Sequence, residues 1–262
     1  MRVAELATEG LRVAPYVMLV SLRVGVLFAL LPAPFGEVAP VRIRAVLGFL
    51  VAFAISLPSL GNAYGLSVDP PVLLIGSLTE LMVGAVMGLT VRTTLAAADS
   101  AGTLAGTAMG LGFANQIDPL FGGEGVPTSA IMNSLAVLIF FVLNGHHVVL
   151  EALSASLTLA PPGGGIPSFQ FDELIVLGSK IVAQGLRIAS PVVATMFIVQ
   201  LGLALVARAA PRVQIFALSF GVTITIGALI LVMSAPQLAQ TIGATIATIP
   251  DALARVMPGA PR

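Results

Sequence analysis

Seven long apolar segments, separated by more polar connectors, account for most of this chain. A helix that crosses the hydrocarbon core of a bilayer needs about 20 predominantly apolar residues. Only 9% of the 262 residues are charged. Because an average soluble domain has about 25% charged residues, this chain cannot cover a water-exposed surface. The sequence therefore predicts an all-α integral membrane protein. The segments are residues 13–31, 43–60, 71–91, 93–114, 129–150, 190–207 and 213–235.

One of these segments, 93–114, is a weak candidate span because it is rich in Ala, Gly and Thr and is interrupted by Asp99. Cytoplasmic loops of membrane proteins are enriched in Lys and Arg, and the basic connectors here are 32–44, Arg92 and 208–212. They fall on one side of the membrane only if 93–114 does not span. We therefore expect about six long hydrophobic helices, with a small-residue helix and loop over 93–128 inserted among them.

The region before the sixth span has a different pattern. Lys180, Gln184 and Arg187 recur at helical spacing over residues 174–190, which predicts an amphipathic helix. Pro191 predicts a kink where the apolar segment 190–207 begins.

Small residues recur four positions apart in three of the segments, a spacing that places them on one side of a helix. In membrane proteins such stripes allow the backbones of neighbouring helices to approach closely. We predict that these residues pack against other helices: Gly84, Gly88, Ala98, Gly102, Gly106, Ser219, Thr223 and Gly227.

Two charged residues lie inside predicted spans, Arg23 in the first and Glu80 near the middle of the third. An isolated charge at the centre of a bilayer costs roughly 3 kcal/mol on insertion scales. We therefore expect Glu80 to be paired, with Arg23 as the obvious partner. The alternative is that Glu80 lines a polar conduit.

Composition excludes several classes of function. The 12 Lys and Arg balance the 12 Asp and Glu, so no basic field for nucleic acid exists. The chain has no Cys and two His, which leaves little for nucleophilic catalysis. His146 and His147 precede Glu151, but only one His shares a helix face with it and no third ligand is evident. Motifs for phosphate or dinucleotide binding are missing. We predict no catalytic residues, no metal and no cofactor.

Several sequence blocks occur in an order and spacing that resemble one known family. The blocks are residues 23–34, 41–44, 80–89, 109–119, 143–147, 202–211 and 213–216. Together they resemble the flagellar export-gate family FliR and its injectisome counterpart SctT, over nearly the whole chain.

The resemblance implies a bacterial inner-membrane protein within the flagellar basal body. Members of this family form a gate with FliP-like and FliQ-like subunits, next to FlhA-like and FlhB-like export components. Unfolded proteins pass through this gate, driven by the proton motive force and a separate ATPase. The resemblance also implies one export-gate domain over 1–262, in which a FliP-like part (1–173) precedes a FliQ-like part (174–262).

In this family the loop that follows the small-residue helix projects into the pore as a plug. The resemblance assigns this role to residues of the segment 109–121, and charge counting picks out the same region as an inserted element. The expected gate residues are Met109, Gly110, Gly112, Phe113, Asn115, Gln116, Asp118, Pro119 and Phe121.

Two other functions remain open on the sequence. The chain could serve an injectisome instead of a flagellum. It could also be a small-solute secondary transporter, but such folds usually contain two matching interrupted segments, and 93–128 has no counterpart in the second half. An intramembrane enzyme lacks a nucleophile and base.

Overall fold

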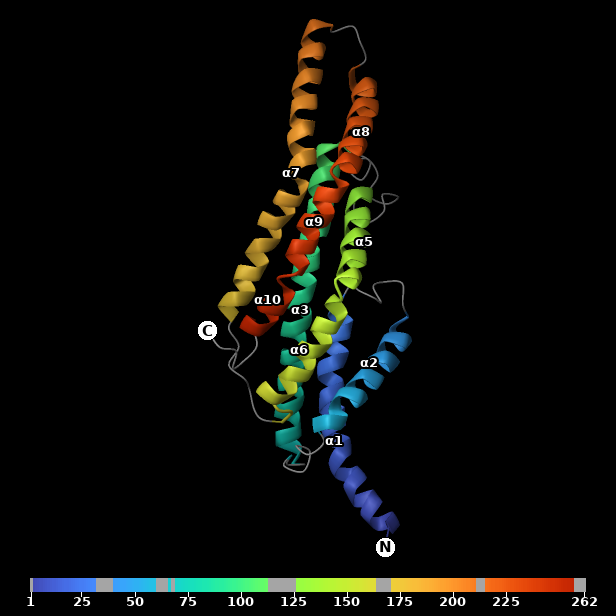
Figure 1. Ribbon diagram of the computed structural model, residues 1–262, viewed down its shortest axis with the longest axis vertical. Coiled ribbons are helices and arrows are strands. Elements are labelled where there is room, and N and C mark those ends of the chain that lie inside the picture. The colour runs from blue at the N-terminus through green and yellow to red at the C-terminus, as the bar shows by residue number, and fades with distance from the viewer. Residues whose placement is uncertain are drawn as a thin grey trace. The chain divides into compact units, whose positions relative to one another are not determined.

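The computed structural model describes residues 2–31, 40–59, 66, 69–112, 126–163, 171–210 and 215–256, and within these ranges the fold is helical without a strand (Figure 1). Four of the described helices are long and apolar enough to cross a membrane, or up to six if two bent pairs each count as one span. The prediction of an all-α membrane protein is confirmed. The helices are α1 (Arg2–Leu30), α2 (Val41–Ser56), α3 (Pro70–Ala108), α5 (Pro127–Val142), α6 (Gly145–Leu159), α7 (Phe171–Ala209), α8 (Ile215–Met233), α9 (Ala235–Ile246) and α10 (Ile249–Val256).

The small-residue segment is helical, but it is the second half of α3 and not a separate helix. Segments 71–91 and 93–114 join because no proline separates them, so nothing interrupts the helix at Arg92. A helix of 39 residues is about 58 Å long at 1.5 Å per residue, nearly twice the roughly 30 Å of a hydrocarbon core. One perpendicular span cannot contain α3.

A second fusion occurs in α7, which unites the expected amphipathic helix with the span that follows it. Pro191 lies inside α7 and has no N–H to donate to the carbonyl of Arg187. The Ser190 hydroxyl donates to that carbonyl instead, at 2.8 Å. The vacant acceptor is therefore satisfied, and the helix continues through the proline.

One apolar run is broken where the sequence analysis expected continuity. Segment 129–150 is divided between α5 and α6 at Asn144, which has a left-handed φ of 55°. Asn is one of the few residues that adopt this conformation readily. The last predicted run, 213–235, ends at Ser234 close to its expected end, but the sequence analysis did not predict the helices α9 and α10 that follow.

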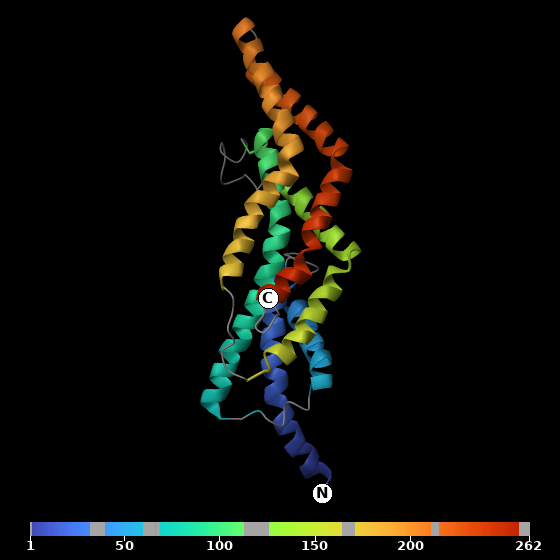
Figure 2. The same cartoon turned by 60° about the vertical axis from the view of Figure 1, so that its left-hand side comes forward.

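The chain divides into two compact units. The first consists of Met1–Thr93, Asn144–Leu177 and Thr248–Arg262. In it α1 and α2 lie side by side (Figures 1 and 2), where the Tyr16 hydroxyl donates to Ser59 Oγ at 2.9 Å. Helices α6 and α10 also pack together there.

The second unit consists of Thr94–Leu143 and Gly178–Ala247. It contains the second half of α3, with α5, α8, α9 and most of α7. Helix α5 packs along α9, where Gly243 lies near Ile139 and Leu143. Its apolar core forms around Met109 and Met196, both buried.

Candidate functional site

The C-terminus of α3 is closed by a glycine in a left-handed conformation. Gly110 has a φ of 83°, and its N–H donates to the carbonyl of Thr107 at 3.0 Å. The N–H of Leu111 reaches back to the carbonyl of Gly106 at 2.9 Å. These two bonds form a Schellman motif, which ends a helix at a residue with positive φ. The position where α3 stops is therefore set by Gly110.

Met109, the residue before this glycine, is only 2% exposed and packs with Ala105, Val192 and Met196. Helix α8 leaves space for it at Gly227, because a Cβ there would lie 2.5 Å from both Cγ and Cε of Met109. A predicted gate residue and a predicted packing residue thus meet in one contact. The end of α3 is held against α7 and α8 by a buried side chain.

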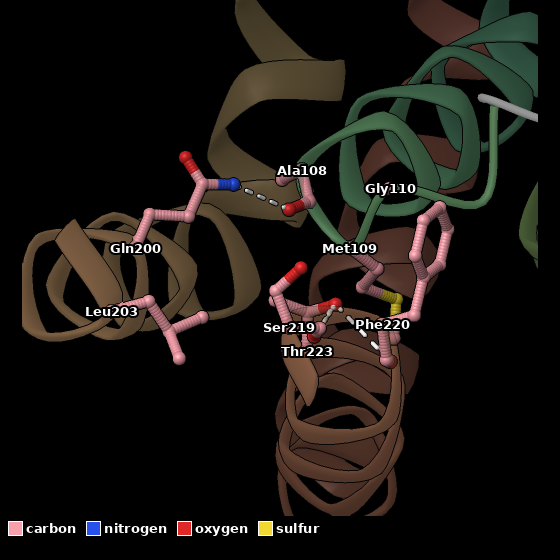
Figure 3. A pocket seen from close by; sticks show the side chains of 8 residues that line it. All are labelled: Ala108, Met109, Gly110, Gln200, Leu203, Ser219, Phe220 and Thr223. Atoms are coloured by element: carbon pink, nitrogen blue, oxygen red, sulfur yellow. Dashed lines mark hydrogen bonds between the residues drawn. The ribbon is translucent and has the colours of Figure 1, made fainter. Parts of the chain in front are cut away.

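A pocket opens beside Met109, between the end of α3 and helices α7 and α8 (Figure 3). The Gln200 side chain of α7 reaches across it, and its Nε2 donates to the carbonyl of Ala108 at 2.9 Å. This bond satisfies one of the carbonyls left without a partner in the last turn of a helix. The predicted packing residues Ser219 and Thr223 line the α8 side of the pocket.

The small-residue stripe of α3 packs on the start of α5. The Thr128 hydroxyl donates to the carbonyl of Gly102 at 2.6 Å, and a Cβ on Gly102 would lie 2.5 Å from Ser129 Cα. A Cβ on Gly106 would overlap the side chains of Thr128 and Val126. These contacts hold the end of α3 against the start of α5. The chain that connects Gly106 to Thr128 therefore begins and ends at the same packed contact.

The described part of the predicted gate segment ends at Gly112. A Cβ on Gly112 would make ordinary contact, 3.5 Å from Thr107 Cγ2. The remaining predicted gate residues lie outside the described residues: Phe113, Asn115, Gln116, Asp118, Pro119 and Phe121.

Ala98 is buried at the start of the same stripe, between the two α3 residues of a contact that the sequence analysis missed. In α7, Gly185 passes so close to α3 that its Cβ would overlap Ser100 Oγ and lie 3.2 Å from the Ala97 carbonyl oxygen. The available signal was weak, because Gly185 is one of two glycines in the predicted amphipathic region 174–190 and no second glycine lies four residues from it.

The first unit contains a buried ion pair between Arg23 of α1 and Glu80 of α3, both with fully buried side chains. The guanidinium binds the carboxylate through two bonds, Nε to Oε2 at 2.5 Å and Nη2 to Oε1 at 2.9 Å. Two further N–H groups reach α6 and the residue after it, from Nη1 to Ser156 Oγ (2.8 Å) and from Nη2 to the carbonyl of Ala160 (2.7 Å). Each guanidinium nitrogen thus has a partner, and three segments are connected.

The other predicted stripe, Gly84 and Gly88, allows this geometry. A Cβ on Gly84 would overlap the carbonyl oxygen of Arg23. A Cβ on Gly88 would lie 2.9 Å from Leu30 Cβ. Because both positions are glycine, α1 and α3 approach closely enough for the two-bond pair to form. Sequence analysis named Arg23 and Glu80 but missed Ser156, since a serine on an apolar helix gives no distinctive signal.

The site therefore consists of packed helix ends and one buried ion pair. Among the described residues, no group of three or more His, Cys, Asp or Glu lies close enough together to hold a metal ion. The sequence was compared with known proteins. Residues 14–249 match the model of the family described as bacterial export proteins, family 1.

Individual relatives are similar over most of their length. Flagellar biosynthetic protein FliR of Escherichia coli K12 is 31% identical over 83% of both chains. The protein of that name in Bacillus subtilis 168 is 26% identical over 84% of this chain and 85% of its own. Yop proteins translocation protein T of Yersinia pestis is 24% identical over 77% and 78%. The chain therefore belongs to the bacterial export proteins, family 1.

Proposed function

We propose that this chain is a structural and gating subunit of the flagellar type III protein-export channel in the bacterial inner membrane. It forms the gate with FliP-like and FliQ-like subunits, next to FlhA-like and FlhB-like components, and unfolded proteins cross through it. Family membership supports a membrane component of an export apparatus. The flagellar assignment is supported by the relatives named for flagellar biosynthesis, because the E. coli protein is 31% identical and the Yersinia translocation protein 24%.

The gating role is supported mainly by the packing at the two ends of the segment between Gly112 and Val126. On one side Met109 is held in the space beside Gly227, and on the other Gly102 and Gly106 contact Val126 and Thr128. A loop that closes the gate must move aside for a substrate, while the helices that hold it, here the end of α3 and the start of α5, stay in place. We propose that Met109–Phe121 is this element.

Assembly is tested by purifying the tagged chain from its own organism in mild detergent. A gate subunit is expected to co-purify with FliP-like and FliQ-like proteins. A small-solute transporter would be recovered alone or as a homo-oligomer, and that outcome would contradict the proposal.

The flagellar assignment is tested by deleting the gene in its own organism and restoring it on a plasmid. Loss of filaments and of secreted flagellar subunits, with recovery on complementation, is expected. Normal motility combined with loss of an injectisome substrate from the medium would instead assign the chain to the virulence-type apparatus.

A further inference from the structure

The exposed side of α3 changes its chemical character along the helix. In the first half it has large apolar side chains, at Leu74, Ile75, Leu78, Leu81, Met82 and Leu89. Between residues 93 and 112, all within the described part of the chain, the exposed positions are Asp99, Thr103, Leu104 and Thr107. Because a carboxylate in hydrocarbon is costly, an exposed side that includes Asp99 is suited to water and not to acyl chains.

Asp99, Thr103 and Thr107 form a polar stripe, because they recur four positions apart and fall within a sector of about 80° on a helix. The Thr103 hydroxyl donates to the carbonyl of Asp99 at 3.1 Å, and the Thr107 hydroxyl donates to that of Thr103 at 2.9 Å. Asp99 has no ion-pair partner among the described residues, where Arg23 pairs with Glu80. The stripe therefore offers a partner few free donors, and its carboxylate is suited to water.

The second unit leaves the polar stripe uncovered between two packed contacts. On a helix that turns about 100° per residue, Gly106 lies about 20° to one side of the stripe and Ser100 about 20° to the other. Gly106 packs against the start of α5, and Ser100 meets Gly185 of α7. The stripe ends at Thr107, two residues before the buried Met109 that anchors the end of α3. It therefore leads directly to the segment proposed as the closing element.

We propose that the polar stripe of α3 lines the water-filled passage on the approach to the gate, where the exported chain moves past it. This inference rests on the proposed function, since it requires an export channel. A charged side chain on a membrane helix generally faces a water-filled cavity or the interior of a bundle. Apolar surface and unpaired polar groups would both hold a passing chain, and the stripe has neither at its threonines. Asp99 adds a fixed negative charge, which attracts cations and basic side chains.

The first test labels single cysteines with a membrane-impermeant thiol reagent in the purified export complex in nanodiscs. The chain contains no cysteine, so Thr103→Cys and Thr107→Cys each introduce one thiol, at nearly the size of the residue replaced. The matched control, Leu205→Cys, lies at an exposed apolar position of α7 in the same unit. Both threonine variants should react about tenfold faster than the control, because the reagent attacks the thiolate and apolar surroundings disfavour it.

The labelling is repeated on complexes that hold a stalled flagellar subunit, fused to a stably folded domain that cannot enter the passage. The stalled chain should slow the reaction of Thr103→Cys and Thr107→Cys and leave that of Leu205→Cys unchanged. Slow labelling of both threonine variants in the empty complex would overturn the inference, because a partner subunit would then cover the stripe. Fast labelling that the stalled chain does not slow would also overturn it. Either result leaves co-purification with partner subunits, and with it the export function, intact.

The charge of Asp99 is tested by the ion selectivity of the complex that lacks residues 114–120. Asp99→Asn should lower its cation-to-anion permeability ratio about threefold, the effect in water of one unit charge close to the path of the ion. The control Asp251→Asn removes an exposed carboxylate of α10 and should leave the ratio unchanged. An unchanged ratio in Asp99→Asn would contradict the inference. Absence of flux through the deleted complex would contradict the gating role alone, and the labelling results would then decide the inference.

Discussion

At the scale of single residues, the glycines of this chain have three different physical roles. Gly110 provides a backbone conformation, with a φ of 83° and nothing within 4 Å of a Cβ. Gly227 provides space, because Met109 occupies the position of its Cβ. Gly202 does neither in the described part of the chain, where its Cβ would meet nothing within 4 Å. The same substitution at these positions therefore has different expected results.

Gly110→Ala is expected to destabilise the protein by about 1–2 kcal/mol, because an L-residue at positive φ brings its Cβ too close to the backbone. Thermal unfolding in detergent measures this. Gly202→Ala is the matched control and should stabilise the protein by about 0.5–1 kcal/mol, since alanine is preferred to glycine inside a helix. Equal effects at both positions would contradict the role of Gly110 in ending α3.

Glu80→Gln is expected to reduce the yield of assembled complex, because it leaves the buried guanidinium of Arg23 without its counter-charge. Removing one partner of a buried pair costs about 3–5 kcal/mol. Yield is measured by co-purification of the partner subunits. The double variant R23M/E80M, which removes both charges, should recover part of it. A Glu80→Gln complex that assembles fully but no longer exports would favour a polar conduit instead.

At the scale of elements, the sequence predicted helix content better than helix ends. Hydrophobic length identified the apolar runs that became α1, α2 and α8. It could not show that α3 and α7 each continue through a predicted boundary. In α7 the Ser190 hydroxyl satisfies the carbonyl that Pro191 leaves without an N–H donor, and hydrophobic length does not report such a bond. The break at Asn144 depends on a left-handed residue, and Asn can also continue a helix.

Gly106→Leu is expected to separate α3 from the start of α5, because even its Cβ would overlap Thr128 and Val126. Overpacking of this kind costs about 1–3 kcal/mol or more. The variant should still insert into the membrane but lose co-purification with partner subunits. Gly25→Leu, at an exposed position of α1 with nothing within 4 Å, is the control. Normal assembly of Gly106→Leu would show that this contact is dispensable.

Gly227→Ala is expected to displace Met109 from α8, with a loss of about 1–3 kcal/mol for the forced repacking. Gly221→Ala on the same helix has open space at its Cβ and should not destabilise. Protease sensitivity near residue 112 reports whether the end of α3 has been released. If M109A/G227A is as destabilised as the sum of its single variants, the two residues do not interact.

At the scale of the whole molecule, the candidate features are divided between the two units. The ion pair of Arg23 and Glu80 belongs to the first unit, and the anchored end of α3 belongs to the second. In the sequence, the ion pair corresponds to two charges inside predicted spans, and the end of α3 corresponds to a stripe of small residues. The sequence could not show that Met109 packs on Gly227, because the two residues are far apart in the chain and only folding brings them together.

The most direct test of the account measures ion leak through the assembled complex reconstituted in vesicles. One variant lacks residues 114–120 and keeps α3 and the start of α5, while a control variant lacks residues 164–168. The account predicts that the first deletion preserves assembly and raises ion flux, because the closing element is removed from an intact stem, and that the control remains as tight as the unaltered complex. Unchanged flux through a fully assembled complex without residues 114–120 would contradict the claim that this chain closes the gate.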